Sequence, residues 1–288
     1  MNPRTGNGHA PNGQHHPKTA FVLGGGGNLG AVQVGMVRAL LERDIKPDMI
    51  LGCSVGALNG AAIAGDPSVA GAERLSLIWQ NLRSGEVFPA PGITSVVALL
   101  RKGRHALGSN AGLRRLIEEL ASFRTFEEAV VPLQVVATSL ATGSARWFQS
   151  GPIVEPILAS AALPAVFPPV EIDGELHVDG AVVDNVPITR AVELGAERIY
   201  VCHVGNFQRP RTAPKRPIDV LLQSFSIARN HRFSTEMSSK WAGVDLIVLP
   251  GVDPGPLARA DFRRTPELID LGYETALSGL LGTSVTTR

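Results

Sequence analysis

The chain has only two cysteines among its 288 residues, and its apolar runs are short. Two cysteines give no disulfide framework, and Cys53 and Cys202 both stand in apolar stretches, where a small buried thiol is expected. No run approaches the ~18 apolar residues of a membrane-spanning helix. The formal net charge is +1, so there is no electrostatic case for nucleic acid as a partner. These features favour a cytoplasmic globular protein in a reducing compartment.

The two ends of the chain differ from its middle. Residues 1–18 are rich in Gly, Asn, Pro and His and contain no apolar secretory core, so we expect a disordered N-terminal tail. Its histidines are irregularly spaced, which favours a solvated leader over a metal site. Because no internal repeat and no long linker divides the rest, we expect one domain over residues 19–282, followed by a short tail over 283–288.

Apolar periodicity predicts alternating strands and helices. Residues 19–23 form a short apolar run typical of a buried strand, and residues 28–43 carry apolar side chains at helical spacing. A strand over 49–51 and a helix over 55–64 repeat this order. Further strands are expected over 133–139, 198–204 and 244–249, and further helices over 67–82, 112–120, 152–160, 189–194, 217–234 and 265–281. This order predicts an α/β domain with a mostly parallel central sheet covered by helices on both faces.

A serine motif follows the second predicted strand. Residues Gly52-Cys53-Ser54-Val55-Gly56 have the pattern G-x-S-x-G, in which a serine stands on a strained turn between a strand and a helix. The small residues on either side leave its hydroxyl exposed. The motif therefore predicts a nucleophilic Ser54.

A glycine loop follows the first predicted strand, and its sequence Gly25-Gly26-Gly27-Asn28-Leu29-Gly30 allows two interpretations. One is the dinucleotide-binding fingerprint, which requires an acidic residue at the end of the second strand. Asp44 and Asp48 both precede that position. The other is an oxyanion site, because unshielded backbone N–H groups at a helix N-terminus stabilise the negative charge of an acyl-transfer intermediate.

A nucleophilic serine needs a base. His231 lies inside a predicted helix, which is a poor position for a triad base. His203 ends a predicted strand and His177 lies two residues before an aspartate, positions at which histidine is more often structural. The histidines therefore offer no strong candidate.

Asp179 is the better candidate for the base. Asp173-Gly174 has the chemistry of a tight hairpin turn, and Asp179 ends the strand that returns from it. Gly180 and Ala181 follow and allow close backbone approach. Asp179 can therefore either take the serine proton directly or stabilise a turn.

With these three motifs in order, the chain resembles the patatin-like phospholipase family over about residues 19–281. Three more segments are similar to family features: 160–169, 184–187 and 268–273. The resemblance implies a three-layer α/β/α fold and lipid acyl hydrolysis by a Ser–Asp dyad, with no metal and no organic cofactor. It implies that Ser54 is the nucleophile and Asp179 the proton acceptor.

The resemblance also assigns the glycines. The backbone N–H groups of Gly25, Gly26 and Gly27 would form the oxyanion hole. The remaining motif positions are Gly30, Gly52, Gly56, Gly180 and Ala181. One position departs from the family: Leu29 stands where Arg or Lys commonly precedes the last glycine of the loop. If that cation helps to bind or polarise the substrate, its absence implies either a lower activity or a less anionic acyl ester.

We therefore expect a cytoplasmic serine acyl hydrolase acting on phospholipid, lysophospholipid or a related ester. Its contact with the inner membrane surface would be transient, and no pattern predicts an oligomeric state. Two other classes stay open: a non-catalytic lipid-binding or regulatory protein on the same scaffold, and a dinucleotide-binding oxidoreductase. Residues 87–110 combine an apolar run with Arg101, Lys102 and Arg104, which is typical of a lipid-contacting lid or of an ordinary helix connection.

Overall fold

The computed structural model describes residues 18–83, 85, 109–204, 213–214, 217–239, 241–253 and 261–283. The predicted tails lie outside these ranges except for residues 18 and 283. The segment 87–110, for which the sequence leaves open a lid or an ordinary helix connection, also lies outside them except for its last two residues.

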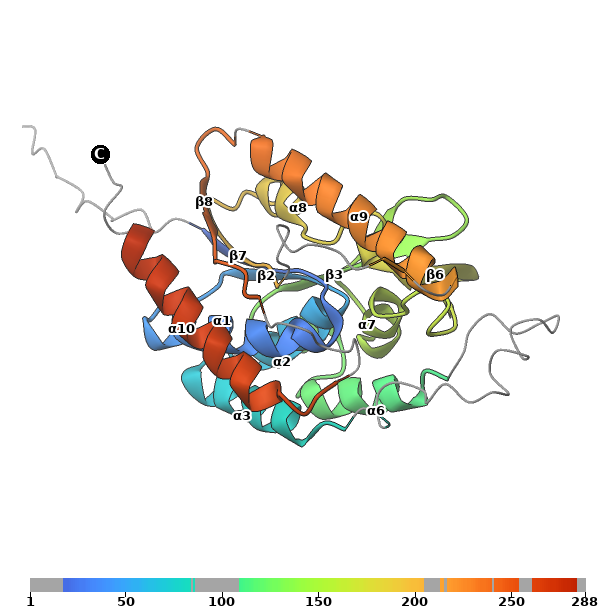
Figure 1. Cartoon of the computed structure of the whole chain (residues 1–288), viewed down its shortest axis with the longest axis horizontal. Coiled ribbons are helices and arrows are strands. Elements are labelled where there is room, and N and C mark those ends of the chain that lie inside the picture. The colour runs from blue at the N-terminus through green and yellow to red at the C-terminus, as the bar shows by residue number, and fades with distance from the viewer. Residues whose placement is uncertain are drawn as a thin grey trace, which may run out of the picture.

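The described residues form an eight-stranded sheet at the centre of the molecule, in the order β5-β6-β3-β2-β1-β7-β8, with β4 paired to β3 (Figure 1). The five strands from β3 to β8 in this order are parallel, whereas β4, β5 and β6 are antiparallel to their neighbours. Their bounds are β1 Thr19–Leu23, β2 Met49–Cys53, β3 Leu133–Ser139, β4 Ala145–Phe148, β5 Val170–Ile172, β6 Glu175–Asp179, β7 Arg198–Cys202 and β8 Asp245–Val248.

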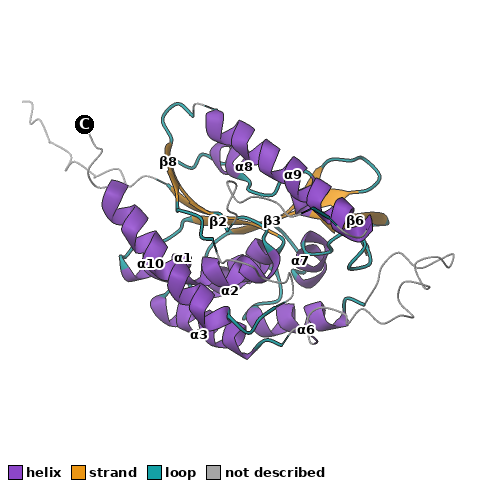
Figure 2. Ribbon diagram, in the orientation of Figure 1, coloured by secondary structure: helices purple, strands orange, loops and turns teal. Residues whose placement is uncertain are grey.

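Helices cover both faces of this sheet (Figure 2). One face carries α1 Gly30–Glu42, α2 Val55–Gly65, α3 Val69–Asn81, α6 Ala111–Leu120, α7 Val154–Ser160 and α10 Thr265–Thr283. The other face carries α8 Ile188–Glu193 and α9 Pro217–Ser238. None of the helices in the described ranges combines the length and apolar character that crossing a membrane requires.

The side chains of β1 show how the sheet divides the core. Phe21 and Leu23 pack into the larger apolar cluster, and Ala20 and Val22 pack into the smaller cluster on the opposite face. Since both sets are fully buried, the strand is a continuous apolar run, as expected for a strand covered on both sides. The prediction of a three-layer α/β/α fold with a mostly parallel sheet is confirmed.

Most predicted elements lie within a few residues of the observed ones. The predicted strand over 198–204 ends at Cys202, and the predicted helix over 217–234 continues to Ser238. The strand β4 was not predicted, because only Phe148 among its four residues is buried and the segment forms no apolar run.

The pairing along β3 explains where the site forms. Cys53, the last residue of β2, lies opposite Val136, and Asp179, the last residue of β6, lies opposite the next residue, Ala137. The strand β4 pairs with Val135 to Thr138 of β3, a stretch that includes residues paired with β2 and residues paired with β6. Because β4 occupies one edge of β3 along this stretch, β2 and β6 both lie along the other edge. These two strands therefore meet end to end.

Candidate active site

Ser54 lies on the turn between β2 and α2 with φ 55° and ψ −125°. A positive φ is strained for a residue with a side chain and persists only where the surroundings enforce it. One restraint is the Ser54 N–H, which donates to the buried Ser160 Oγ at 2.9 Å. Another is close packing after the turn, where a Cβ on Gly56 would lie 2.0 Å from the Leu23 carbonyl oxygen. The turn therefore has the geometry that the G-x-S-x-G motif predicts.

The Ser54 hydroxyl donates to a carboxylate. Its Oγ lies 2.7 Å from Asp179 Oδ2. The other carboxylate oxygen, Oδ1, accepts the Ala181 N–H at 2.9 Å and lies 3.9 Å from Cys53 Sγ. The serine and aspartate singled out in the sequence, 125 positions apart, are thus in direct contact.

Burial dominates the ionisation of Asp179. The residue is 2% exposed, and loss of hydration raises the pKa of its carboxyl from 3.8 to about 6, although the Ala181 N–H and the Ser54 hydroxyl both oppose this rise. A base with a pKa near the working pH is ionised at pH 7 and still accepts a proton readily. The Cys53 thiol beside it is buried, and its pKa is raised well above 9, so it stays protonated.

The last residue of α7 and the segment that follows it hold both Ser54 and Asp179. Ser160 accepts the Ser54 N–H, and the Ala162 carbonyl oxygen accepts the Asp179 N–H at 3.0 Å. On the other side, Thr138 Oγ1 of β3 donates to the Asp179 carbonyl oxygen at 2.9 Å. The sequence indicated a family-like stretch at 160–169 but no role for Ser160, since a single buried serine has no distinctive pattern.

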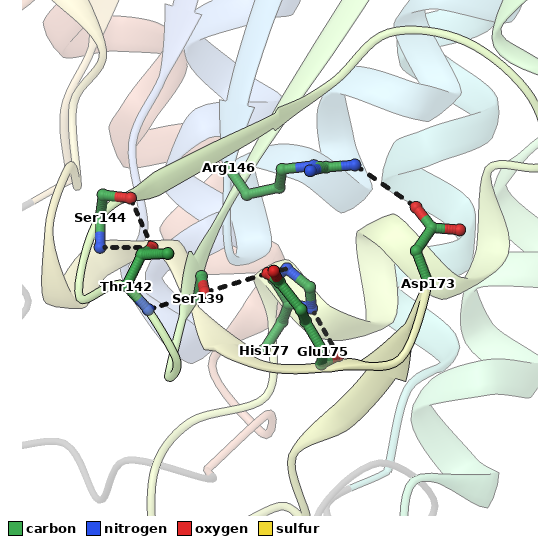
Figure 3. Close-up of polar contacts among 7 residues, drawn as sticks. All are labelled: Ser139, Thr142, Ser144, Arg146, Asp173, Glu175 and His177. Carbon is green, nitrogen blue, oxygen red and sulfur yellow. Dashed lines mark hydrogen bonds and ion pairs between the residues drawn. The ribbon is translucent and has the colours of Figure 1, made fainter.

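The three histidines weighed as bases lie in other surroundings. His177 Nδ1 lies 3.0 Å from the Glu175 carbonyl oxygen, and its ring packs beside Glu175 and Ser139 (Figure 3). His203 stacks on Phe233 with 4.6 Å between ring centroids, and His231 is exposed on α9. The Ser54 hydroxyl instead donates to Asp179.

The glycine loop borders the serine turn, because β1 and β2 are parallel neighbours with Leu23 opposite Gly52. A Cβ on Gly25 would lie 3.0 Å from the Ser54 Cβ. The Gly25 N–H already donates to the Asn185 carbonyl oxygen at 3.2 Å. Within the described ranges, the N–H groups of Gly26 and Gly27 have no recorded acceptor. Of the three predicted oxyanion donors, the N–H groups of Gly26 and Gly27 are therefore available to a substrate, within the part of the chain that the structure describes.

A buried network of polar side chains, Gln33, Asn59 and Trp79, holds the backbone of this loop. Gln33 Nε2 donates to the Gly24 carbonyl oxygen at 2.6 Å and to the Cys202 carbonyl oxygen at 2.9 Å. Asn59 Nδ2 donates to Gln33 Oε1 and to the Gly30 carbonyl oxygen, both at 3.0 Å. Trp79 Nε1 completes the network by donating to Asn59 Oδ1 at 2.8 Å. Gly24 and Gly30, at the two ends of the loop, are thereby held in place. The signal for this network in the sequence is a polar residue, Gln33 or Asn59, inside an otherwise apolar predicted helix.

The acidic residues that a bound dinucleotide would need lie elsewhere. Asp48 Oδ2 accepts the Thr19 N–H at 2.7 Å, at the opposite ends of β1 and β2 from the glycine loop. Asp44 is exposed in the turn after α1 and pairs with Lys46. The Leu29 side chain packs partly buried against the larger core cluster. The loop therefore presents neither an acidic ribose ligand nor a cation at that position.

Comparison with known proteins shows which family the chain matches. A family model described as patatin-like phospholipase matches residues 21–192. A patatin-like phospholipase domain-containing protein of Caenorhabditis elegans is 32% identical over 193 residues, which make up 65% of this chain and 14% of that protein.

Two other relatives have comparable similarity. An uncharacterized NTE family protein of Mycobacterium tuberculosis is 31% identical over 188 residues, covering 64% of this chain and 48% of that protein. A lysophospholipase of Mycosarcoma maydis is 29% identical over 209 residues, covering 70% of this chain and 10% of that protein. The chain thus spans less than half the length of these relatives.

Proposed function

Because the chain belongs to the patatin-like phospholipase family, we propose that it is a carboxylic-ester hydrolase of lipids that works through a Ser54–Asp179 dyad. The observation that carries the proposal is the 2.7 Å hydrogen bond from Ser54 Oγ to a buried carboxylate, on a strained turn beside the glycine loop. The family supports the lipid class of substrate. The geometry supports the assignment of roles.

The reaction has two halves. Ser54 Oγ attacks the acyl carbonyl carbon while Asp179 Oδ2 takes the hydroxyl proton, and the carbonyl oxygen becomes an oxyanion. The N–H groups of Gly26 and Gly27 stabilise this negative charge. When the intermediate collapses, the carbon–oxygen bond to the leaving alcohol breaks and the proton on Asp179 passes to that alcohol. Water then attacks the acyl-serine with Asp179 as base, which releases a fatty acid and restores Ser54.

The substrate we propose is a phospholipid or lysophospholipid. One relative is named a lysophospholipase, and Leu29 gives the glycine loop an apolar residue where the family commonly has a cation. An ester with little negative charge near the reacting carbonyl suits this loop best. Cytoplasmic location, transient membrane contact, independence from metals and cofactors, and the 19–282 domain boundaries remain predictions.

Fatty acid release from lysophosphatidylcholine tests the proposal. Wild-type protein should release fatty acid, whereas Ser54→Ala and Asp179→Asn should each lose nearly all turnover and remain folded. Matched controls are Ser278→Ala, whose hydroxyl bonds only within α10, and Asp173→Asn at the exposed hairpin turn (Figure 3). Both controls should keep wild-type rates. Full activity in either dyad variant would refute the assignment, and inactive wild-type protein would favour a lipid-binding role.

A further inference from the structure

The Asn185 side chain is buried near Ser54, and no described residue forms a hydrogen bond with it. Asn185 lies between the 3₁₀ turn Gly180–Val182 and α8, and only 4% of its surface is exposed. Among the residues that the structure describes, neither Oδ1 nor Nδ2 of its carboxamide has a hydrogen-bond partner. Buried polar atoms in proteins nearly always have one, so an unpartnered carboxamide requires an explanation.

The position of this carboxamide relates it to the reaction. A Cβ placed on Gly25 would lie 2.6 Å from Asn185 Oδ1 and 3.0 Å from the Ser54 Cβ, so both atoms border the same point on the glycine loop. The Asn185 backbone also touches the loop, since its carbonyl oxygen accepts the Gly25 N–H. Asn185 therefore accepts the Gly25 N–H, one of the three predicted oxyanion donors, and places its own carboxamide close to Ser54.

A second buried asparagine provides the contrast. Asn59 also borders the glycine loop and is fully buried, but its carboxamide donates to Gly30 and Gln33 and accepts from Trp79. Asn59 thus has the bonding expected of a structural asparagine. Asn185 is equally enclosed and makes none of these bonds, so loop support does not account for its polar atoms.

We propose that Asn185 is a further catalytic residue, whose carboxamide N–H donates to the oxyanion formed when Ser54 attacks an ester. The inference rests on the proposed function and completes a set of three donors with Gly26 and Gly27. A half-turn of the terminal carboxamide exchanges its oxygen and nitrogen, so the N–H can occupy the position beside Gly25 that Oδ1 now holds. This turn breaks no hydrogen bond to the described part of the chain, because neither atom makes one there.

Kinetics of the full chain on a p-nitrophenyl acyl ester test the inference. In Asn185→Ala, kcat should fall by about 100-fold to 1,000-fold, the typical loss for one oxyanion donor, while KM changes less than about threefold. Binding of a trifluoromethyl ketone that forms the tetrahedral adduct should weaken by a similar factor. Tm should not fall, since no bond within the protein is lost. The matched control is Asn81→Ala, whose side chain bonds only within α3.

Several results would overturn the inference. A kcat within about threefold of wild type, or a raised KM with unchanged kcat, would show that Asn185 does not act on the oxyanion. If the alanine variant fails to fold, Asn185→Asp carries the test, because it keeps the shape, removes the N–H donor and should lose at least as much kcat. Activity that depends on Ser54 but not on Asn185 would refute this inference alone. An inactive wild-type protein would refute both proposals together.

Discussion

Replacing Asp179, the proposed base, should stabilise the protein while abolishing its activity. In Asp179→Asn, the amide oxygen can accept the Ala181 N–H and the amide nitrogen can donate to Ser54 Oγ, so both hydrogen bonds of the wild-type carboxylate have counterparts. The substitution removes only the buried negative charge. Since that charge has lost its hydration, the fold should gain free energy of unfolding wherever the wild-type carboxyl is ionised.

The raised pKa gives the size of the gain. The carboxyl of Asp179 titrates at about 6 in the folded protein and at 3.8 as an ordinary aspartate, so between these values the folded state holds a proton that the unfolded state has released. The stability that this proton provides is fully present below about pH 4 and is lost as pH rises through 6. At pH 7, Asp179→Asn should therefore exceed wild type in free energy of unfolding by about 3 kcal/mol, or roughly 5 °C in Tm.

Urea denaturation of both proteins between pH 5 and pH 8 measures this difference. The advantage of Asp179→Asn over wild type should grow by about 1 kcal/mol between pH 5 and pH 7 and stay constant above that. Other titrating groups, including Asp184, whose pKa burial raises to about 7, are present in both proteins and cancel. A variant that is less stable than wild type at pH 8, or equally stable at every pH, would refute the argument.

Three further perturbations test other parts of the site. Because Asp179 must be ionised to act as a base, kcat/KM for ester hydrolysis should fall tenfold per pH unit below about 6 and level off above it; a flat profile from pH 5 to pH 8 would contradict this role. Gln33→Leu leaves the Gly24 carbonyl without its donor and removes one of the two donors to the Cys202 carbonyl. The cost should be about 1–3 kcal/mol, so Tm should fall by roughly 2–5 °C in a thermal scan, and an unchanged Tm would show that the network is not stabilising. Ser160→Ala leaves the Ser54 N–H without its acceptor and should lower the free energy of unfolding by about 1–3 kcal/mol in urea titrations, whereas wild-type stability would mean that this bond contributes nothing.

Local sequence patterns single out both residues of the proposed dyad. The G-x-S-x-G motif indicates a serine on a strand-to-helix turn, and the Asp173-Gly174 hairpin indicates where the strand that ends at Asp179 begins. These signals are short-range, since each depends on a few adjacent residues and the turn they form. The parallel order of β1 and β2 was also predictable from the alternation of strands and helices.

The contact between the dyad residues depends on pairing that local patterns do not encode. Ser54 and Asp179 meet because β2 and β6 end opposite successive residues of β3, and strand register is set by the whole sheet. Two further hydrogen bonds join segments that are distant in the sequence: Ser54 N–H donates to Ser160 Oγ, and Gly25 N–H donates to the Asn185 carbonyl oxygen. Neither follows from spacing along the chain.

Labelling by a fluorophosphonate probe tests the central claim most directly, because only an activated serine reacts readily with it. Wild-type protein should gain one probe mass at pH 7.5, and peptide mapping should place the adduct on Ser54. Ser54→Ala should gain none, and Asp179→Asn should react far more slowly because the hydroxyl has lost its base. An adduct on another residue, or equal labelling rates in wild type and Asp179→Asn, would contradict the Ser54–Asp179 dyad.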